Sequence, residues 1–142
     1  MAQLSELHTL GRGECLELLR TVTVGRIGFT ESALPAIHPV NFTLEGDNVI
    51  IRTSGGGKLA AAVNGAVVAF EADDIDTATR TGWSVVVVGH ASLIRDINQL
   101  VALAGPEGRP WVRGRTDHVI RIKTERITGR RIIVEQEHPG PG

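Results

Sequence analysis

The chain has 142 residues, of which 42% are hydrophobic and 22% charged, and its formal net charge at pH 7 is −1. This length and this ordinary balance predict a single domain with a buried core. A net charge so close to zero provides no broad basic surface, so we expect no nucleic acid as a partner. The single cysteine, Cys15, excludes an internal disulfide and favours a reducing compartment.

The N-terminus lacks the basic flank and the long apolar segment of a signal peptide. The apolar run at residues 85–88 is far too short to span a bilayer, as are the other apolar runs of the chain. We therefore expect a cytoplasmic protein without a membrane partner.

The first predicted element is a helix over residues 4–21, either continuous or broken at residues 11–13, because apolar side chains recur there at helical spacing. Residues 24–29 alternate and contain β-branched side chains, which predicts a strand. Two glycines in it, Gly25 and Gly28, indicate bends or close contact with another backbone. Residues 31–35 then predict a turn into the next strand.

The middle of the chain predicts a β-hairpin. Residues 38–42 and 49–53 are its strands, and residues 44–48 form the turn between them, where Gly46 tolerates a positive φ angle. The second strand leads into a glycine-rich loop that opens an alanine-rich helix.

That loop combines two hydroxyls, three glycines and one lysine at residues 53–58. Glycines let several backbone N–H groups point at one anion, Lys58 adds a positive charge, and the helix presents its positive end there. The pattern predicts a phosphate-binding loop, and the alternative is a floppy turn with a solvated lysine. It is not a P-loop, because Arg52 and Leu59 stand where that motif needs a glycine and a hydroxyl residue.

In the second half, residues 66–71 predict a buried strand and residues 72–82 a polar connection. Residues 83–93 are rich in valine and predict a strand that is covered on both faces. A helix is predicted over residues 96–104, followed by a loop over 107–116. Two strands follow over 118–123 and 127–134, the second with a bulge or bend at 128–130. Residues 135–142 are expected to form a disordered tail.

Many short strands with few helices favour a mainly β protein, built as a closed or nearly closed antiparallel barrel. A doubly wound sheet would need strands and helices to alternate throughout, which they do not. We expect one domain over residues 1–134.

The order of these motifs over residues 5–134 resembles the pyridoxamine 5′-phosphate oxidase-like flavoproteins, the FMN-binding split-barrel family. No single motif is specific, but their order along the chain is. The segments that carry the resemblance are 24–29, 38–42, 51–58, 70–71, 82–91 and 120–131. Within the family, the chain is similar to nitroimidazole-resistance-like proteins and to small actinobacterial-type paralogues. The resemblance implies a six-stranded antiparallel split barrel that forms a homodimer, with flavin sites at the interface.

The resemblance also implies the cofactor site. Residues 39–42 lie along the flavin ring, residues 52–58 hold the phosphate and ribityl chain, Trp83 and Ser84 come from the partner subunit, and Trp111 closes the pocket. The implied cofactor-binding residues are His38, Pro39, Val40, Asn41, Phe42, Arg52, Thr53, Ser54, Gly57, Lys58, Trp83, Ser84 and Trp111.

The expected function is a flavin-dependent oxidoreductase that acts on a small molecule, and no acid or base is assigned. FMN is the expected cofactor, with the deazaflavin F420 as the alternative, since both carry a phosphate. The chain lacks the additional loop arginine and the C-terminal Arg-x-His signature of the vitamin-synthesising members, which disfavours vitamin B6 synthesis. The alternatives are an F420-dependent reductase of the same fold, a flavin-binding or storage protein with little turnover, and a ligand-free structural dimer.

Four side chains allow more than one interpretation. Ser84 lies in Gly82-Trp83-Ser84-Val85-Val86, which misses the G-x-S-x-G pattern of a hydrolase and leads into a strand, so we expect a hydroxyl donor rather than a nucleophile. His38 either faces the flavin as a hydrogen-bond donor or lies on an exposed strand face. Trp83 and Trp111 occupy poor core positions and are expected at a flavin ring or a subunit contact, with simple rim packing as the alternative for Trp111.

No metal site is expected. Asp73, Asp74 and Asp76 fit the spacing of no calcium loop, so we expect them in a solvated turn. Five scattered histidines and one cysteine give no zinc pattern.

Overall fold

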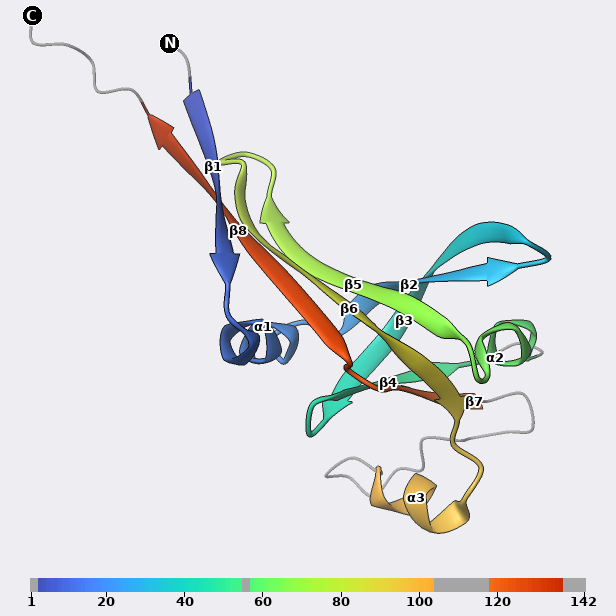
Figure 1. The fold of residues 1–142 in the computed structure, drawn as a ribbon. Helices are drawn as coiled ribbons and strands as arrows, with labels where there is room; N and C mark the ends of the chain where they lie inside the picture. Colours follow the sequence, from blue (N-terminus) through green and yellow to red (C-terminus); the bar gives the residue numbers. More distant parts are fainter. Residues whose placement is uncertain (1–2, 55–56, 104–117, 137–142) are drawn as a thin grey trace, which may run out of the picture.

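The computed structural model describes residues 3–54, 57–103 and 118–136, which form a mainly β fold (Figure 1). This confirms the coarse expectation of a mainly β protein with few helices. In chain order the elements are β1 (Gln3–Leu10), α1 (Arg12–Leu19), β2 (Val24–Glu31), β3 (Leu34–Glu45), β4 (Asn48–Thr53), α2 (Lys58–Val63), β5 (Val67–Asp76), β6 (Thr81–Leu93), α3 (Ile97–Ala102), β7 (His118–Ile122) and β8 (Arg126–Gln136). None of these helices has the length and apolar character needed to cross a membrane.

All eight strands belong to one antiparallel sheet, in the order β1-β8-β6-β5-β2-β3-β4-β7. The sheet closes on itself because β6 also pairs with β7. The length of β6 makes this possible, since its residues 82–88 pair with β8 and its residues 91–93 pair with β7. Six strands therefore form a closed ring, from which β8 and β1 extend the sheet outward (Figure 1).

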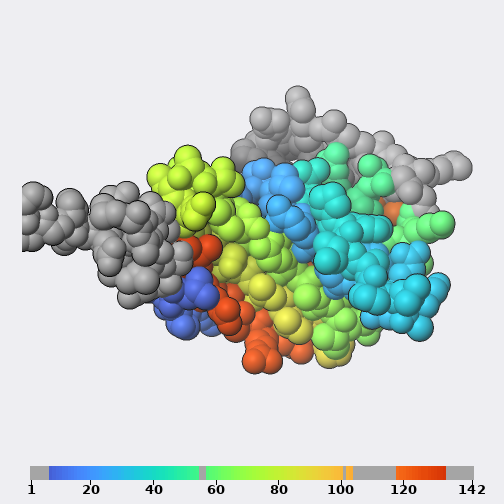
Figure 2. Space-filling view, turned by 90° about the horizontal axis from the view of Figure 1, so that it is seen from above, coloured from blue at the N-terminus to red at the C-terminus, as the bar shows by residue number. Residues whose placement is uncertain are grey.

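Strands β8, β6, β5, β2 and β3 lie side by side on the face of the molecule shown in Figure 2. Some side chains on the outer surface of these strands are apolar. Ile37 of β3 is 72% exposed and Val67 of β5 is 57% exposed. Exposed apolar side chains gathered on a sheet face are typical of surfaces that contact another protein.

The described residues form eight strands, whereas seven strand segments were expected from the sequence and the family resemblance implied a six-stranded barrel. Residues 4–10, expected as the start of a helix, form β1 and pair along their length with β8. The leucines in this segment recur every three residues, which favours a helix locally. Pairing with the edge of β8 instead satisfies the backbone of both strands, and α1 begins only at Arg12. β8 itself runs to Gln136, two residues into the expected tail, and residues 137–142 lie outside the described part.

The polar connection expected over residues 72–82 consists of two strand ends and a short turn. β5 continues to Asp76, and β6 begins at Thr81. Oδ1 of Asp76 accepts hydrogen bonds from the N–H groups of Ala78 and Thr79, at 2.9 and 3.2 Å, and these close the turn. Pairing of β5 with β6 along ten residue pairs outweighs the low strand propensity of the aspartates.

The bulge expected at residues 128–130 is wrong, because the register of β8 with β6 and β1 is regular there. Gly129 has a packing role instead: a Cβ atom on this residue would overlap Cys15 Sγ, so glycine leaves room for α1 against the sheet. The close backbone contact expected at Gly25 is confirmed, since a Cβ atom there would lie 2.7 Å from the Glu71 carbonyl oxygen.

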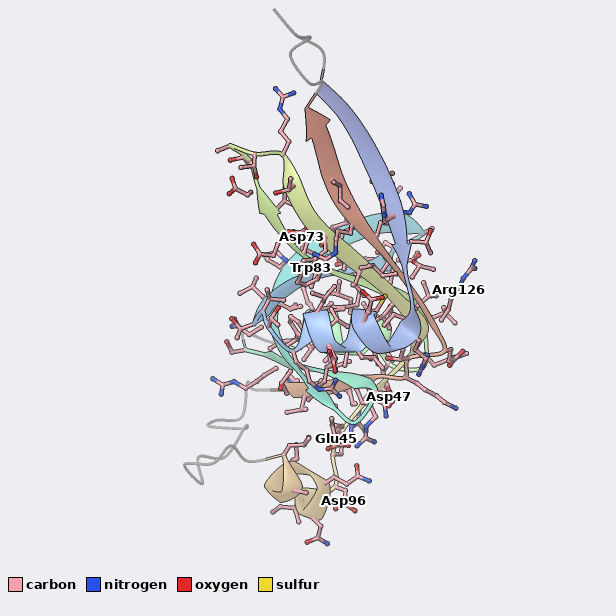
Figure 3. All side chains as sticks on the ribbon, turned by 90° about the vertical axis from the view of Figure 1, so that its left-hand side faces the viewer. Glu45, Asp47, Asp73, Trp83, Asp96 and Arg126 are labelled. Atoms are coloured by element: carbon pink, nitrogen blue, oxygen red, sulfur yellow. The ribbon has the colours of Figure 1, made fainter. Side chains whose placement is uncertain are left out.

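The main core lies inside the ring and takes alternate residues from each strand. Along β6, Trp83, Val85 and Val87 are buried, and Ser84 and Val86 between them are half-buried. The expectation that Trp83 is a poor core position is wrong, because its side chain is only 6% exposed and packs in the main core (Figure 3). The cause is the unexpected length of β5, which continues past residue 71 and pairs with Trp83 through Asp74, while Arg131 of β8 pairs with Trp83 on the other side.

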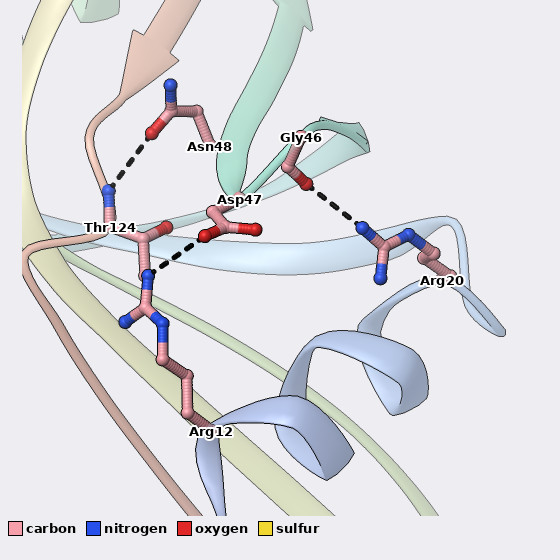
Figure 4. Close-up of polar contacts among 6 residues, drawn as sticks. All are labelled: Arg12, Arg20, Gly46, Asp47, Asn48 and Thr124. Carbon is pink, nitrogen blue, oxygen red and sulfur yellow. Dashed lines mark hydrogen bonds and ion pairs between the residues drawn. The ribbon is translucent and has the colours of Figure 1, made fainter.

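Polar contacts fix the β3–β4 turn to α1 and to the segment between β7 and β8 (Figure 4). The contacts are Arg12 Nη2 to Asp47 Oδ2 at 3.3 Å, Arg20 Nη2 to the Gly46 carbonyl oxygen at 3.0 Å, and the Thr124 N–H to Asn48 Oδ1 at 3.4 Å. These contacts hold the turn end of the β3–β4 hairpin, and the opposite end of the hairpin borders a pocket.

Candidate functional site

A pocket of about 460 Å³ lies where β3, the end of β4 and the start of α2 meet. Its volume falls in the range of small-molecule and cofactor sites. It brings together nine of the predicted cofactor-binding residues and one additional residue, Leu59. The lining residues are His38, Pro39, Val40, Asn41, Arg52, Thr53, Ser54, Gly57, Lys58 and Leu59.

The pocket exists because the β3–β4 hairpin opens at this end. Pairing between the two strands begins at Asn41 and Arg52. Residues 38–40 of β3 pair with β2 on one side, and among the described strands none pairs with their other edge. β4 leaves the sheet after Thr53 and turns toward α2. An open strand edge, with its backbone polar groups, thus forms one wall of the pocket, and the loop before α2 forms the other.

The end of the loop requires glycine at residue 57. Gly57 has φ +73°, a left-handed conformation that side-chain-bearing residues rarely adopt. Its carbonyl oxygen accepts a hydrogen bond from the Ala61 N–H at 2.9 Å, which starts α2. Ala60 and Val63 are buried and anchor the helix to the core, while Lys58 stays exposed. Because α2 has only six residues, we assign the positive character of this site to side chains rather than to a helix dipole.

Two cations line the pocket, Arg52 on β4 and Lys58 at the start of α2. Across the described residues, no carboxylate lies within ion-pair distance of either one, whereas Arg12, Arg26 and Arg121 all have such a partner. The hydroxyls of Thr53 and Ser54 belong to the same pocket. Two uncompensated cations beside two hydroxyl donors are suited to an anion with several acceptor oxygens, such as a phosphate.

His38 lines the pocket and is exposed. Its ring meets the Phe29 ring edge-on, with 5.1 Å between the ring centroids and 85° between the planes. This contact between β2 and β3 sets the orientation of the imidazole at the pocket wall.

Three of the predicted site residues that the structure describes, Phe42, Trp83 and Ser84, do not line this pocket. Phe42 is 5% exposed and packs edge-on against Phe70 in the core, with ring centroids 4.7 Å apart. Trp83 is buried in the core, and Ser84 is half-buried on the opposite face of β6. Trp111 and the loop residues 55–56 lie outside the described residues. The role assigned to Trp83 and Ser84 belongs to a second subunit and remains a prediction.

A second polar cluster, which the sequence analysis missed, lies on the outer face of the sheet. Arg26 Nη1 donates to Glu71 Oε1 at 2.7 Å and to Asp73 Oδ2 at 3.1 Å. Burial of Glu71, its hydrogen bond with Asp73 and the negative charge of Asp73 raise the pKa of Glu71 to about 7, although Arg26 acts in the opposite direction. The three side chains, together with Gly28, Ile37, Ala69 and Val86, line a hollow of about 380 Å³.

This cluster corrects the prediction that Asp73, Asp74 and Asp76 lie in a solvated turn, since all three belong to β5. The pairing of Arg26 with Glu71 across β2 and β5 brings the charges together, and no local sequence signal marks that pairing. Within the ranges that the structure describes, no group of three or more histidine, cysteine, aspartate or glutamate side chains is placed to hold a metal ion.

Comparison with known proteins places the chain in a family. A family model described as pyridoxamine 5′-phosphate oxidase matches residues 11–131. An uncharacterized protein of Mycobacterium tuberculosis, Rv0080, is 44% identical over 139 residues, which cover 94% of this chain and 91% of the relative.

Two solved structures are similar over nearly the whole chain. The FAD binding protein from Mycobacterium smegmatis is 35% identical with a TM-score of 0.69, covering 89% of this chain and 98% of that one. A candidate pyridoxamine 5′-phosphate oxidase from Corynebacterium glutamicum is 33% identical with a TM-score of 0.73, at the same coverage. The family model spans most of the chain, and the order of motifs along the sequence indicated the same family. The chain therefore belongs to the pyridoxamine 5′-phosphate oxidase family.

Proposed function

We propose that this protein is a flavin-dependent oxidoreductase that binds FMN, with the cofactor phosphate held in the pocket between β3, β4 and α2. The observation that carries the proposal is the convergence of Arg52 and Lys58, neither with a carboxylate partner among the described residues, at a pocket with two hydroxyl donors. The solved structure of the FAD binding protein from Mycobacterium smegmatis, at 35% identity, supports a flavin as the ligand class.

The residues present fit such a cofactor. Arg52 and Lys58 would neutralise the phosphate, and the hydroxyls of Thr53 and Ser54 would donate to its oxygens. The open edge of β3 at residues 38–40 would lie along the ring system and offer backbone groups to its polar edge. The flavin, once bound, supplies the electron-transfer chemistry, while the protein supplies binding, orientation and exclusion of water. No side chain is assigned as an acid or a base.

The proposed active form is a homodimer of split barrels, with the sites completed at the interface. The exposed apolar side chains on the outer sheet face, Ile37, Val67 and Ile75, support a covering partner. In this arrangement the segment with Trp83 and Ser84 of each subunit would contact the pocket of the other, as the family resemblance implies. Ser84 would offer its half-buried side chain, whereas Trp83, whose side chain packs in the core, would offer only its backbone. This is consistent with their absence from the pocket within one chain.

The alternatives differ in cofactor or in turnover. F420 also carries a phosphate, so the same pocket suits an F420-dependent reductase. A flavin-storage protein would bind the dye and transfer few electrons. The substrate is proposed only as a small molecule that stacks on the exposed face of the ring.

The test is a visible spectrum of the purified protein, followed by chromatographic identification of the released dye and by titration of the colourless protein with FMN and with F420. We expect bound FMN, and reduction of the loaded protein by NAD(P)H followed by reoxidation with at least one acceptor from a panel. Binding without turnover would contradict the oxidoreductase and favour storage. A protein whose thermal stability neither dye changes would contradict flavin binding altogether, and a monomer by light scattering would contradict the shared site.

A further inference from the structure

His118, which no motif singled out, lies beside the phosphate loop. It is the first residue of β7 and pairs with Thr53 of β4. A Cβ atom placed on Gly57 would lie 2.9 Å from His118 Nε2, 3.4 Å from Cε1 and 3.5 Å from Cδ2. The Nε2 tip of the imidazole therefore faces the Gly57 backbone directly, in the space that any side chain at residue 57 would occupy.

The ring is half-buried, and within the described residues neither of its nitrogens has a hydrogen-bond or ion-pair partner. A histidine with a purely structural role usually satisfies one ring nitrogen with a carbonyl or a carboxylate, as His90 does by contacting Glu125 Oε1 at 2.6 Å. The Nε2 atom of His118 instead faces a loop that forms part of the candidate anion pocket.

Three cations lie on the described parts of the elements next to His118. β4 contributes Arg52, which is opposite Val119, and the start of α2 contributes Lys58. On β7 itself, Arg121 is paired with Glu45 at 3.1 Å. The parts of β4, β6, β7 and α2 that the structure describes place no carboxylate within ion-pair distance of the ring. Among the described residues, the charged groups of the adjacent pocket that lack a carboxylate partner are therefore cations.

We propose that His118 is the third cation of the phosphate site, and that it takes up a proton from solvent when a terminal phosphate monoester binds beside Gly57. The incoming dianion accepts a hydrogen bond from the protonated ring, which stabilises the imidazolium form. This inference rests on the proposed function. It goes further by naming a residue outside the predicted set and by selecting the ligand class, because a monoester dianion gains more from a third cation than a singly charged diester does.

Titration calorimetry with FMN near pH 7, in buffers that differ in ionisation enthalpy, measures the proton uptake. The wild-type protein should take up more protons per FMN bound than His118→Gln, whose amide keeps a polar group near the position of Nε2 without titrating. The phosphate has its own second pKa near 6, but its titration is common to both proteins and cancels in the difference. His90→Gln removes a histidine distant from the pocket and should leave the proton uptake unchanged.

The affinity ratio of wild type to His118→Gln should be roughly tenfold at pH 6, the scale of one charge-assisted hydrogen bond, and should approach one at pH 8. Should His118→Gln fail to fold, the imidazole of His118 in the wild-type protein can be titrated by NMR with and without FMN, and its midpoint should rise when FMN is bound. Equal proton uptake in both proteins, or an unchanged midpoint, would overturn the assignment of His118 and leave FMN binding intact. Absence of FMN binding to the wild type would overturn the proposed function itself.

Discussion

Arg26 and Glu71 face each other across β2 and β5, with Arg26 Nη1 2.7 Å from Glu71 Oε1. The positive charge of Arg26 does not fully offset the effects that raise the pKa of Glu71. The same nitrogen of Arg26 is shared with Asp73, which it contacts at 3.1 Å. Burial and the neighbouring aspartate raise the pKa of Glu71 from 4.5 to about 7. A proton is thus held on the outer face of the sheet at pH values where an exposed glutamate is ionised.

This pKa predicts how stability depends on pH. The folded state binds the Glu71 proton more tightly than the unfolded chain, so this residue's contribution is fully present below about pH 4.5 and is lost as pH rises to about 7. Denaturant titrations at several pH values between 5 and 8 measure this effect. In Glu71→Gln the part of the pH dependence of stability that comes from Glu71 should be absent, so the variant should gain stability relative to wild type as the pH rises toward 8. Asp74→Asn makes the same change of charge on an exposed residue of β5 and serves as the control. Equal slopes for wild type and Glu71→Gln would contradict the raised pKa.

A second prediction concerns Gly129. In Gly129→Ala the new methyl group would overlap Cys15 Sγ and approach Val85 Cγ2 to 3.3 Å, so we expect a loss of about 1–3 kcal/mol in the free energy of unfolding. Chemical denaturation measures it, with Gly13→Ala, which meets no atom within 4 Å, as the control. In a Cys15→Ala background the same change should cost less, since the overlapping sulfur is gone. An additive double variant would show that the strain lies elsewhere.

The sequence predicted those parts of the site that are contiguous along the chain. The β3–β4 hairpin and the loop that follows it carry local signals, namely a turn around Gly46 and hydroxyls and glycines before Lys58. The pocket gathers these residues because neighbours in sequence remain neighbours in space.

The rest depends on pairing between distant strands, which leaves no local trace. The register of β7 with β4 brings His118 to Gly57, and the register of β5 with β2 brings Glu71 to Arg26. The same cause explains the misassigned first strand, since residues 3–10 become β1 only when the edge of β8 is available. The burial of Trp83 was not expected because the strand over residues 66–71 was predicted to end before Asp74, the residue of β5 that pairs with Trp83.

A third prediction separates backbone strain from the contact with His118. Gly57 and Gly65 both have positive φ angles, +73° and +80°, but only Gly57 faces a neighbouring side chain within 4 Å. Both alanine variants should lose about 1–2 kcal/mol of stability from the left-handed conformation. Only Gly57→Ala should also displace His118 and weaken FMN binding, by fluorescence titration. If Gly65→Ala weakens FMN binding equally, the effect comes from general loosening of the fold rather than from the loop.

The most direct test of the phosphate assignment compares FMN with riboflavin, which lacks the phosphate, on wild type and on Lys58→Ala by equilibrium titration. We expect wild type to prefer FMN, and Lys58→Ala to weaken FMN by about 1–3 kcal/mol while leaving riboflavin nearly unchanged, because the lysine interacts only with the phosphate. If riboflavin binds wild type as tightly as FMN, or if Lys58→Ala weakens both dyes alike, the pocket between β3, β4 and α2 does not bind the phosphate.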